Sequence, residues 1–138
     1  MRDEQFVALP PGYELWVMRG GFGELFGPVY MDRANSRMAF RVDRQHTNPV
    51  EGLHGGAMAT FIDANIAVCY TRPDMHCPTI NLTVDYMRPA KRGDLVEADV
   101  SMLRVTKNLV FMQSIVRVGE TPIARANGVY RNDGIPAR

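Results

Sequence analysis

One apolar segment, residues 56–70, constrains the fold of this chain more than any other part of it. The sequence GAMATFIDANIAVCY shows no alternation of apolar and polar residues, and after Gly56 it contains no glycine or proline. Its apolar side chains occupy nearly every direction around a helical wheel, which is typical of a helix that is buried on most sides. Pro73 ends the helix within a turn. The rest of the chain must therefore be able to surround one long helix.

Strand-like runs flank this helix on both sides. Before it, residues 27–42 read as two short strands joined by a turn at residues 33–36. After it, four runs are separated by turn-forming residues, and they span Thr79–Arg88, Leu95–Val105, Leu109–Val118 and Pro122–Tyr130. In the first run the apolar residues alternate with polar ones, which indicates an antiparallel sheet with one face on a core. The apolar face of that run consists of Ile80, Leu82, Val84 and Tyr86.

A curved antiparallel sheet of about six strands, wrapped around one long central helix, accommodates this order of elements. We therefore predict an α+β protein with the hotdog fold. A ferredoxin-like sandwich is the alternative, but it requires two comparable helices and only one is visible. The length of 138 residues and the 46% apolar content predict a single domain over residues 1–138. Residues 1–24 would form an N-terminal extension, with at most a short helix or turn around residues 13–19.

The overall composition excludes several classes of protein. The net charge of +1 provides no field that would attract nucleic acid or an anionic membrane. No stretch has the length or apolarity of a signal peptide or a membrane span. Cys69 and Cys77 are too few for a disulfide framework and have no metal-ligand spacing, so we expect reduced thiols, no bound metal and a cytoplasmic location.

The start of the predicted helix has the properties of an anion site. The first backbone N–H groups of a helix lack intrahelical partners and carry partial positive charge. The residues before the helix, Leu53, His54, Gly55 and Gly56, include none of the side-chain oxygens that usually cap these groups. We therefore expect free N–H groups that bind an anion or a carbonyl oxygen developing negative charge. A tight strand-to-helix corner is the alternative explanation of the two glycines.

Asp63 is a single carboxylate within the apolar helix. Burying an ionised carboxylate costs several kcal/mol unless it is paired, which favours a functional role, with a structural partner as the alternative. Asp63 lies seven residues after Gly56, about two turns or roughly 10 Å along the axis. One reacting carbonyl cannot touch both groups within about 3 Å. Two antiparallel helices across a two-fold axis would bring them together, so we predict a homodimer.

The segment HTNPVEGLHGGAMATFIDA, residues 46–64, resembles the motif of hotdog-fold acyl-CoA thioesterases of the phenylacetate-degradation type. TINLTVDYMRPAKRGD, residues 79–94, is similar to the third-strand segment of that family, and the resemblance covers roughly residues 25–131. It implies thioester hydrolysis without a metal or a cofactor. Coenzyme A is part of the substrate and is not counted as a cofactor.

By motif position, the resemblance implies that the Gly55 N–H, together with Asn48, polarises the thioester carbonyl. Asp63 of the partner subunit would activate water or attack directly. Thr79 stands where some members have a serine that orients the water. His54 would support the loop and the carbonyl, or would simply be satisfied by loop hydrogen bonds.

The resemblance also implies a binding site for coenzyme A. Its nucleotide end carries phosphates, and basic residues in two turns that we expect to lie near each other are candidates for binding them, although such residues are often simply solvated. Thr106 departs from the family, which often has glycine there, so the phosphate contact at that turn is not defined. The candidate substrate-binding residues are Gly56, Asn81, Arg88, Pro89, Lys91, Arg104 and Lys107.

Two further functions share this fold. Some hotdog domains only sense acyl-CoA, but this chain shows no attached DNA-binding segment. An enoyl-CoA hydratase would have Asp and His a few residues apart, whereas His54 and Asp63 lie nine apart. We therefore predict an acyl-CoA thioesterase that acts as a homodimer or homotetramer. The sequence does not determine the acyl group.

Overall fold

The computed structural model describes residues 8–138, so the first seven residues of the predicted extension lie outside it. Its elements follow one another in the order β1 (Glu14–Trp16), α1 (Gly21–Phe26), β2 (Val29–Asp32), β3 (Arg37–Arg41), η1 (Arg44–His46), α2 (Gly55–Ala64), η2 (Asn65–Cys69), β4 (Thr79–Tyr86), β5 (Leu95–Val105), β6 (Leu109–Val118) and β7 (Thr121–Arg131).

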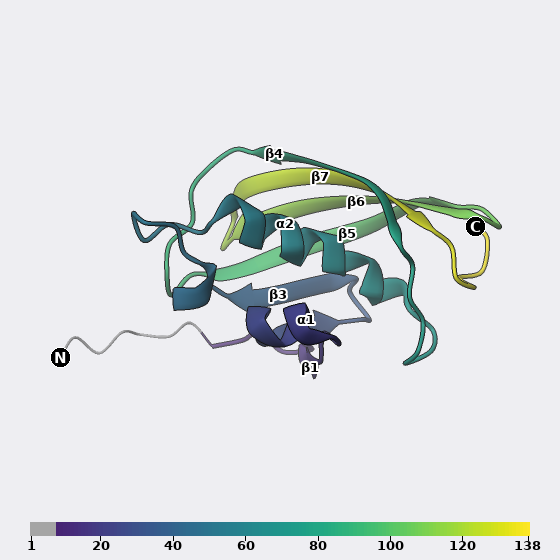
Figure 1. Cartoon of the computed structure of the whole chain (residues 1–138), viewed down its shortest axis with the longest axis horizontal. Coiled ribbons are helices and arrows are strands. Elements are labelled where there is room, and N and C mark those ends of the chain that lie inside the picture. The colour runs from purple at the N-terminus through teal and green to yellow at the C-terminus, as the bar shows by residue number, and fades with distance from the viewer. Residues whose placement is uncertain (1–7) are drawn as a thin grey trace.

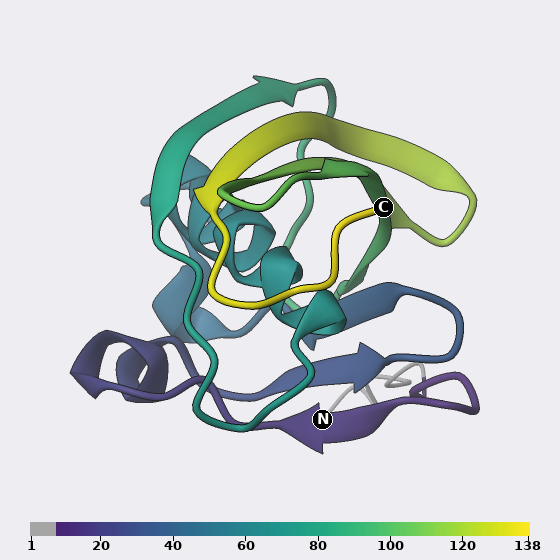
Figure 2. The same cartoon turned by 90° about the vertical axis from the view of Figure 1, so that its right-hand side faces the viewer.

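All seven strands form one antiparallel sheet in the order β1-β2-β3-β5-β6-β7-β4. The sheet curves around α2, which lies along its concave face (Figure 1). Seen from the side, the strands enclose much of the helix (Figure 2). The hotdog fold predicted from the sequence is confirmed, with seven strands instead of about six.

The central helical segment has two parts. The α-helix α2 continues directly into the 3₁₀ helix η2, and together they span residues 55–69, close to the predicted 56–70. Phe61 and Ile62 are fully buried against the sheet, and the Phe61 ring packs on the Phe40 ring of β3 with centroids 4.6 Å apart. Within residues 8–138, no helix is long and apolar enough to cross a membrane.

The N-terminal segment differs from the prediction. A helix or turn was expected around residues 13–19, but Glu14–Trp16 form β1, which pairs with β2 at the edge of the sheet. The short helix comes later, at Gly21–Phe26. A three-residue strand has almost no local pattern, and it is stabilised by hydrogen bonds to β2, which is distant in sequence.

Strand β4 contains a β-bulge that the alternation of its residues did not predict. The register shifts between Thr79, which lies opposite Tyr130, and Asn81, which lies opposite Val129. Ile80 is the extra residue, and it is 59% exposed, so its predicted place on the apolar face is wrong. Because opposed residues share a face and the Tyr130 side chain packs on the α2 side of the sheet, the bulge places the exposed Thr79 on that same side.

Candidate active site

The start of α2 has fewer free donors than expected. The His54 ring Nδ1 accepts a hydrogen bond from the Gly56 N–H at 2.8 Å, so the expectation of an uncapped helix start is wrong for this group. A Cβ on Gly56 would lie 3.0 Å from that ring nitrogen, which explains the glycine. The Gly55 N–H has no acceptor within residues 8–138 and remains available.

This cap determines the tautomer of His54. Because Nδ1 accepts a hydrogen bond, the proton of the neutral imidazole lies on Nε2. The His54 side chain is exposed, so its Nε2–H is open to a ligand. Two consecutive residues, His54 and Gly55, therefore each carry an available donor at the helix start.

The preceding loop is held in place by His46. Its ring is buried, accepts a hydrogen bond from the Asp43 N–H at 3.0 Å and donates to the Phe26 carbonyl at 2.6 Å. Burial lowers the pKa of His46, which favours this neutral form. The His46 carbonyl in turn accepts from the His54 N–H at 2.8 Å. His46 thus links the loop to the start of α2.

Asn48 presents an amide donor. Its Oδ1 accepts hydrogen bonds from the N–H groups of Val50 and Gly52, each at 3.0 Å. These two backbone donors define the orientation of the amide, since only the oxygen can accept them. The Nδ2 group has no hydrogen-bond acceptor in the part of the chain that the structure describes, so it is free to bind a carbonyl oxygen.

Asp63 and Thr79 meet in the folded chain. The Thr79 hydroxyl donates to Asp63 Oδ1 at 2.6 Å, which leaves Oδ2 open to a further ligand. Asp63 is half-buried in the single chain, so the expected deep burial is not observed. The bulge in β4 is what directs Thr79 to this carboxylate.

Two tyrosines support the site, and sequence reasoning missed both. The Tyr130 hydroxyl donates to the backbone carbonyl of Asp63 at 3.1 Å, and burial raises the pKa of Tyr130, which keeps it a neutral donor. The Tyr86 hydroxyl donates to the Gly55 carbonyl at 2.7 Å. Both tyrosines lie on strands and contact residues far away in sequence, so no local motif marks them.

Within one chain, the donors and the carboxylate stay apart. Gly55 and Asp63 are eight residues apart on one helix, a separation of roughly 12 Å along the axis. Strand β4 nevertheless touches both, with Thr79 at its first residue on Asp63 and Tyr86 at its last residue on Gly55. The two halves of the site therefore lie along the same edge strand.

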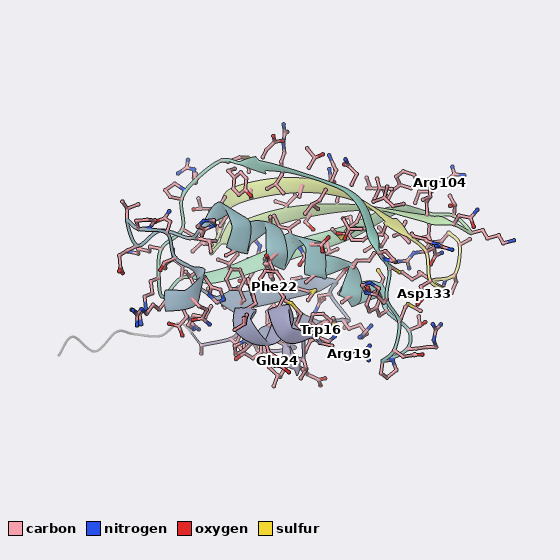
Figure 3. All side chains as sticks on the ribbon, viewed as in Figure 1. Trp16, Arg19, Phe22, Glu24, Arg104 and Asp133 are labelled. Carbon is pink, nitrogen blue, oxygen red and sulfur yellow. The ribbon has the colours of Figure 1, made fainter. Side chains whose placement is uncertain are left out.

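The candidate coenzyme A residues fall into separate groups. Lys91 pairs with Gly52 in an isolated β-bridge, which places the 88–91 segment, with its exposed Arg88 and Pro89, beside the loop before α2. Arg104 and Lys107 lie at the far end of the eleven-residue strand β5, roughly 33 Å away along the strand (Figure 3). The expectation that these two turns are neighbours is wrong within one chain.

Asn81 is exposed on β4, and its Oδ1 accepts a hydrogen bond from the Thr83 hydroxyl at 3.2 Å. It is separated from the free donors at the helix start by most of the strand. Among residues 8–138, no three His, Cys, Asp or Glu side chains gather in an arrangement that would bind a metal ion.

The fold and this arrangement define the class of protein: a hotdog-fold domain with free hydrogen-bond donors at the start of its central helix and a separate carboxylate. The family model described as thioesterase superfamily matches residues 52–124, more than half of the 138 residues. The chain belongs to the thioesterase superfamily, and it is a thioester hydrolase.

Individual relatives agree with this assignment. Acyl-coenzyme A thioesterase 13 of Mus musculus is 33% identical over 73 residues, which cover 51% of this chain and 52% of that protein. The chain thus matches about half of the length of that relative. The crystal structure of thioesterase superfamily member 2, also from Mus musculus, superposes with a TM-score of 0.61 at 25% identity and covers 69% of this chain and 72% of its own.

The crystal structure of a hypothetical thioesterase protein with coenzyme A from Streptococcus pneumoniae superposes with a TM-score of 0.66 at 16% identity, over 91% of each chain. At this identity, the match shows the fold alone. The resemblance to acyl-CoA thioesterases noted in the sequence is confirmed by these comparisons.

Proposed function

We propose that this protein hydrolyses an acyl-CoA thioester to a free carboxylic acid and coenzyme A. The oxygen of water bonds to the thioester carbon, the C–S bond breaks, and the departing thiolate takes up a proton. A thiolate is a good leaving group, because an ordinary thiol has a pKa of about 8.5. Donors for the carbonyl oxygen and one carboxylate can therefore suffice for the reaction.

The donors at the start of α2 are suited to the carbonyl oxygen. The Gly55 N–H is free, and the Asn48 Nδ2 group and the His54 Nε2–H are available from the same loop. Fixed donors of this kind stabilise the oxyanion that forms in the transition state, and losing one typically lowers the rate about 100- to 1,000-fold.

Asp63 supplies the carboxylate. Its Oδ1 is held by Thr79, so Oδ2 is the oxygen that takes a proton from water or attacks the carbonyl carbon. Single-turnover hydrolysis in ¹⁸O-labelled water distinguishes the two routes. With a general base the label enters the product acid. With a nucleophile, Asp63 Oδ2 bonds to the acyl carbon and the thiolate leaves; hydrolysis of the resulting anhydride at the Asp63 carboxyl carbon then leaves the label in the Asp63 side chain in the first turnover.

The active site would be shared between two subunits, and the placement of β4 is the observation that carries this proposal. Within the described residues β4 pairs only with β7, so its outer edge is open to a second copy. Antiparallel pairing of two β4 strands about a two-fold axis places the first residue of one strand opposite the last residue of the other. Thr79 and Asp63 of the partner subunit then lie beside Tyr86 and Gly55.

The same two-fold arrangement accounts for the separated basic residues. It brings the Arg104 and Lys107 turn of one subunit toward the Arg88 and Lys91 segment of the other, where together they would bind the phosphates of coenzyme A. The coenzyme A in the Streptococcus pneumoniae thioesterase supports this ligand for the fold. Back-to-back packing of two such dimers would give the tetramer expected from the resemblance.

A thiol-release assay with a panel of acyl-CoA substrates tests the proposed activity. We expect hydrolysis by the native protein and at least about 100-fold lower kcat in Asp63→Ala, because a general base typically contributes that much. Binding of acyl-CoA without thiol release would instead identify a sensor. Near-normal turnover of Asp63→Ala would remove this residue from the mechanism.

Mixing two inactive variants tests the shared site. A dimer of one Asp63→Ala subunit and one Asn48→Ala subunit contains one complete site and one doubly damaged site. Random reassortment makes about half of the dimers mixed, so the mixture should recover about a quarter of native activity. A mixture that stays as inactive as its components would place the whole site within one chain.

A further inference from the structure

A large cavity opens beside the Asp63–Thr79 pair. Its volume is about 1990 Å³, and four parts of the chain form most of its walls. These are the segment from β1 to α1, one face of α2 and η2, residues 70–77, and the C-terminal residues. Its apolar lining includes Trp16, Met18, Phe22, Ala59, Ala64 and Ile135.

The face of α2 that lines the cavity is built from small residues. Ala59, Thr60, Asp63 and Ala64 all border the cavity, and their spacing places them on one face of the helix. The carboxylate of Asp63 therefore stands next to open space on this face of the helix. A group attached to a carbonyl at Asp63 has room to extend along this face.

The N-terminal segment provides the large apolar side chains. Phe22 on α1 is 68% exposed, and Trp16 on β1 is half-buried, both on the cavity side (Figure 3). An exposed phenylalanine at the rim of a cavity can gain apolar contacts only when something fills the space beside it. Leu25 lies on the same short helix, is 75% exposed and does not line the cavity.

The charged residues in the cavity do not indicate a phosphate site. Arg33 donates to the backbone carbonyls of Val68 and Tyr70, and Arg72 pairs with Asp74 and Asp133. Arg19 likewise donates to the Pro73 carbonyl, and Arg138 donates to Cys69 Sγ. These guanidinium groups are engaged by the protein itself, so the apolar walls define the chemistry of the occupant.

We propose that this cavity binds the hydrocarbon part of the acyl group, and that Trp16 and Phe22 determine the preference for its length. The inference rests on the proposed thioesterase function and adds the substrate class: a straight apolar acyl chain. Typical ligand pockets measure about 300–1,000 Å³, so the cavity has room for such a chain and for parts of a partner subunit.

The position of these residues in the sequence supports a role in specificity. Trp16, Phe22 and Ile135 lie outside residues 52–124, the part that matches the family model, whereas His54, Gly55, Asp63 and Thr79 lie inside it. Most of the groups that would carry the reaction lie within the matched part, and Asn48 lies four residues before it. The large apolar side chains that would select the acyl group lie in segments on either side of the matched part, whereas the α2 face of the cavity lies inside it.

The test compares kcat/KM for acetyl-CoA and dodecanoyl-CoA in the native protein, Phe22→Ala, Trp16→Ala and the matched control Leu25→Ala. Each methylene group that is buried on binding strengthens binding about fourfold. We expect the ratio of kcat/KM for dodecanoyl-CoA to kcat/KM for acetyl-CoA to fall about tenfold in Phe22→Ala and in Trp16→Ala. In both variants kcat/KM for acetyl-CoA should change less than twofold. Leu25→Ala should keep the native ratio.

Three results would overturn the proposal. An unchanged ratio in Phe22→Ala would remove this residue from the acyl site, and an equal fall in Leu25→Ala would indicate a general effect of α1. A change of oligomeric state in Phe22→Ala, measured by sedimentation, with the native ratio retained would make Phe22 a subunit contact. Phe22 is exposed, so its replacement leaves the core intact.

Failure of the proposed function is recognised separately. If the native protein hydrolyses no acyl-CoA, calorimetry still compares the binding of dodecanoyl-CoA and free coenzyme A. A preference for dodecanoyl-CoA that falls about tenfold in Phe22→Ala would then support the cavity without the activity. Equal binding of both ligands by the native protein would overturn the cavity proposal as well.

Discussion

Replacing Thr79 by valine removes one hydroxyl from the site and keeps the shape of the side chain. The lost hydrogen bond is the one from Thr79 to Asp63 Oδ1, at 2.6 Å. A hydrogen bond to a charged group contributes about 1.5–3 kcal/mol, or roughly 10- to 150-fold in rate if it acts in the transition state. Thr79 is exposed in the single chain, so solvent weakens the bond and the lower end applies. We expect kcat/KM to fall about tenfold.

The assay is thiol release with an acyl-CoA that the native protein hydrolyses well. Thr79→Ser is the matched control, because it keeps the donor, and it should stay within about threefold of the native rate. In an Asp63→Asn background, Thr79→Val should change the residual rate less than about twofold, because no base remains to be oriented.

Two results would refute this reasoning. Native kcat/KM in a well-folded Thr79→Val protein would show that the hydrogen bond has no role in turnover. A Thr79→Ser protein as slow as Thr79→Val would show that the rate depends on the methyl group or on strand packing, not on the donor.

Two stability predictions concern buried polar groups. Asn65 is fully buried and donates to the Ser114 hydroxyl at 3.0 Å. Ser114→Ala should therefore lower the free energy of unfolding, measured in urea titrations, by about 1–3 kcal/mol. The control Gln113→Ala, at an exposed neighbouring position, should change it by less than about 0.5 kcal/mol. Because burial lowers the pKa of His46, the unfolded chain binds a proton first as the pH falls below about 6.5. Acidification from pH 7.5 to 5.5 should therefore lower the free energy of unfolding more in the native protein than in the His46→Gln protein, since protonation of His46 removes the acceptor for the Asp43 N–H. An equal or smaller loss in the native protein would contradict this.

The sequence predicted the elements whose residues carry a strong local pattern. The hairpin at residues 29–41, the central helix and the strands β5 to β7 agree with the expectation within a few residues. Strand β1 was missed because its hydrogen bonds go to β2 and not to near neighbours. Helix α1 was missed because Gly21 and Gly23 disfavour a helix by local propensity.

The candidate site was predicted only in part. The resemblance identified Thr79 as a partner for the chemistry at Asp63, and the structure brings the two together. The cap on α2 was missed because the usual rule considers side-chain oxygens, whereas His54 uses a ring nitrogen. The support from Tyr86 depends on how β4 lies along α2, which no local pattern contains.

The bulge at Ile80 has a consequence for how this protein tolerates change. A side chain that points to solvent can be exchanged freely, so the chemical identity of residue 80 matters little. The number of residues at this point decides which face of β4 Thr79 occupies. A regular strand that kept Ile80 would place Thr79 on the same outward face as Asn81, away from Asp63. Deleting Ile80 would instead make Thr79 and Asn81 neighbours opposite Tyr130 and Val129, so an evolving or engineered sequence can lose this residue and still keep Thr79 on the side of Asp63.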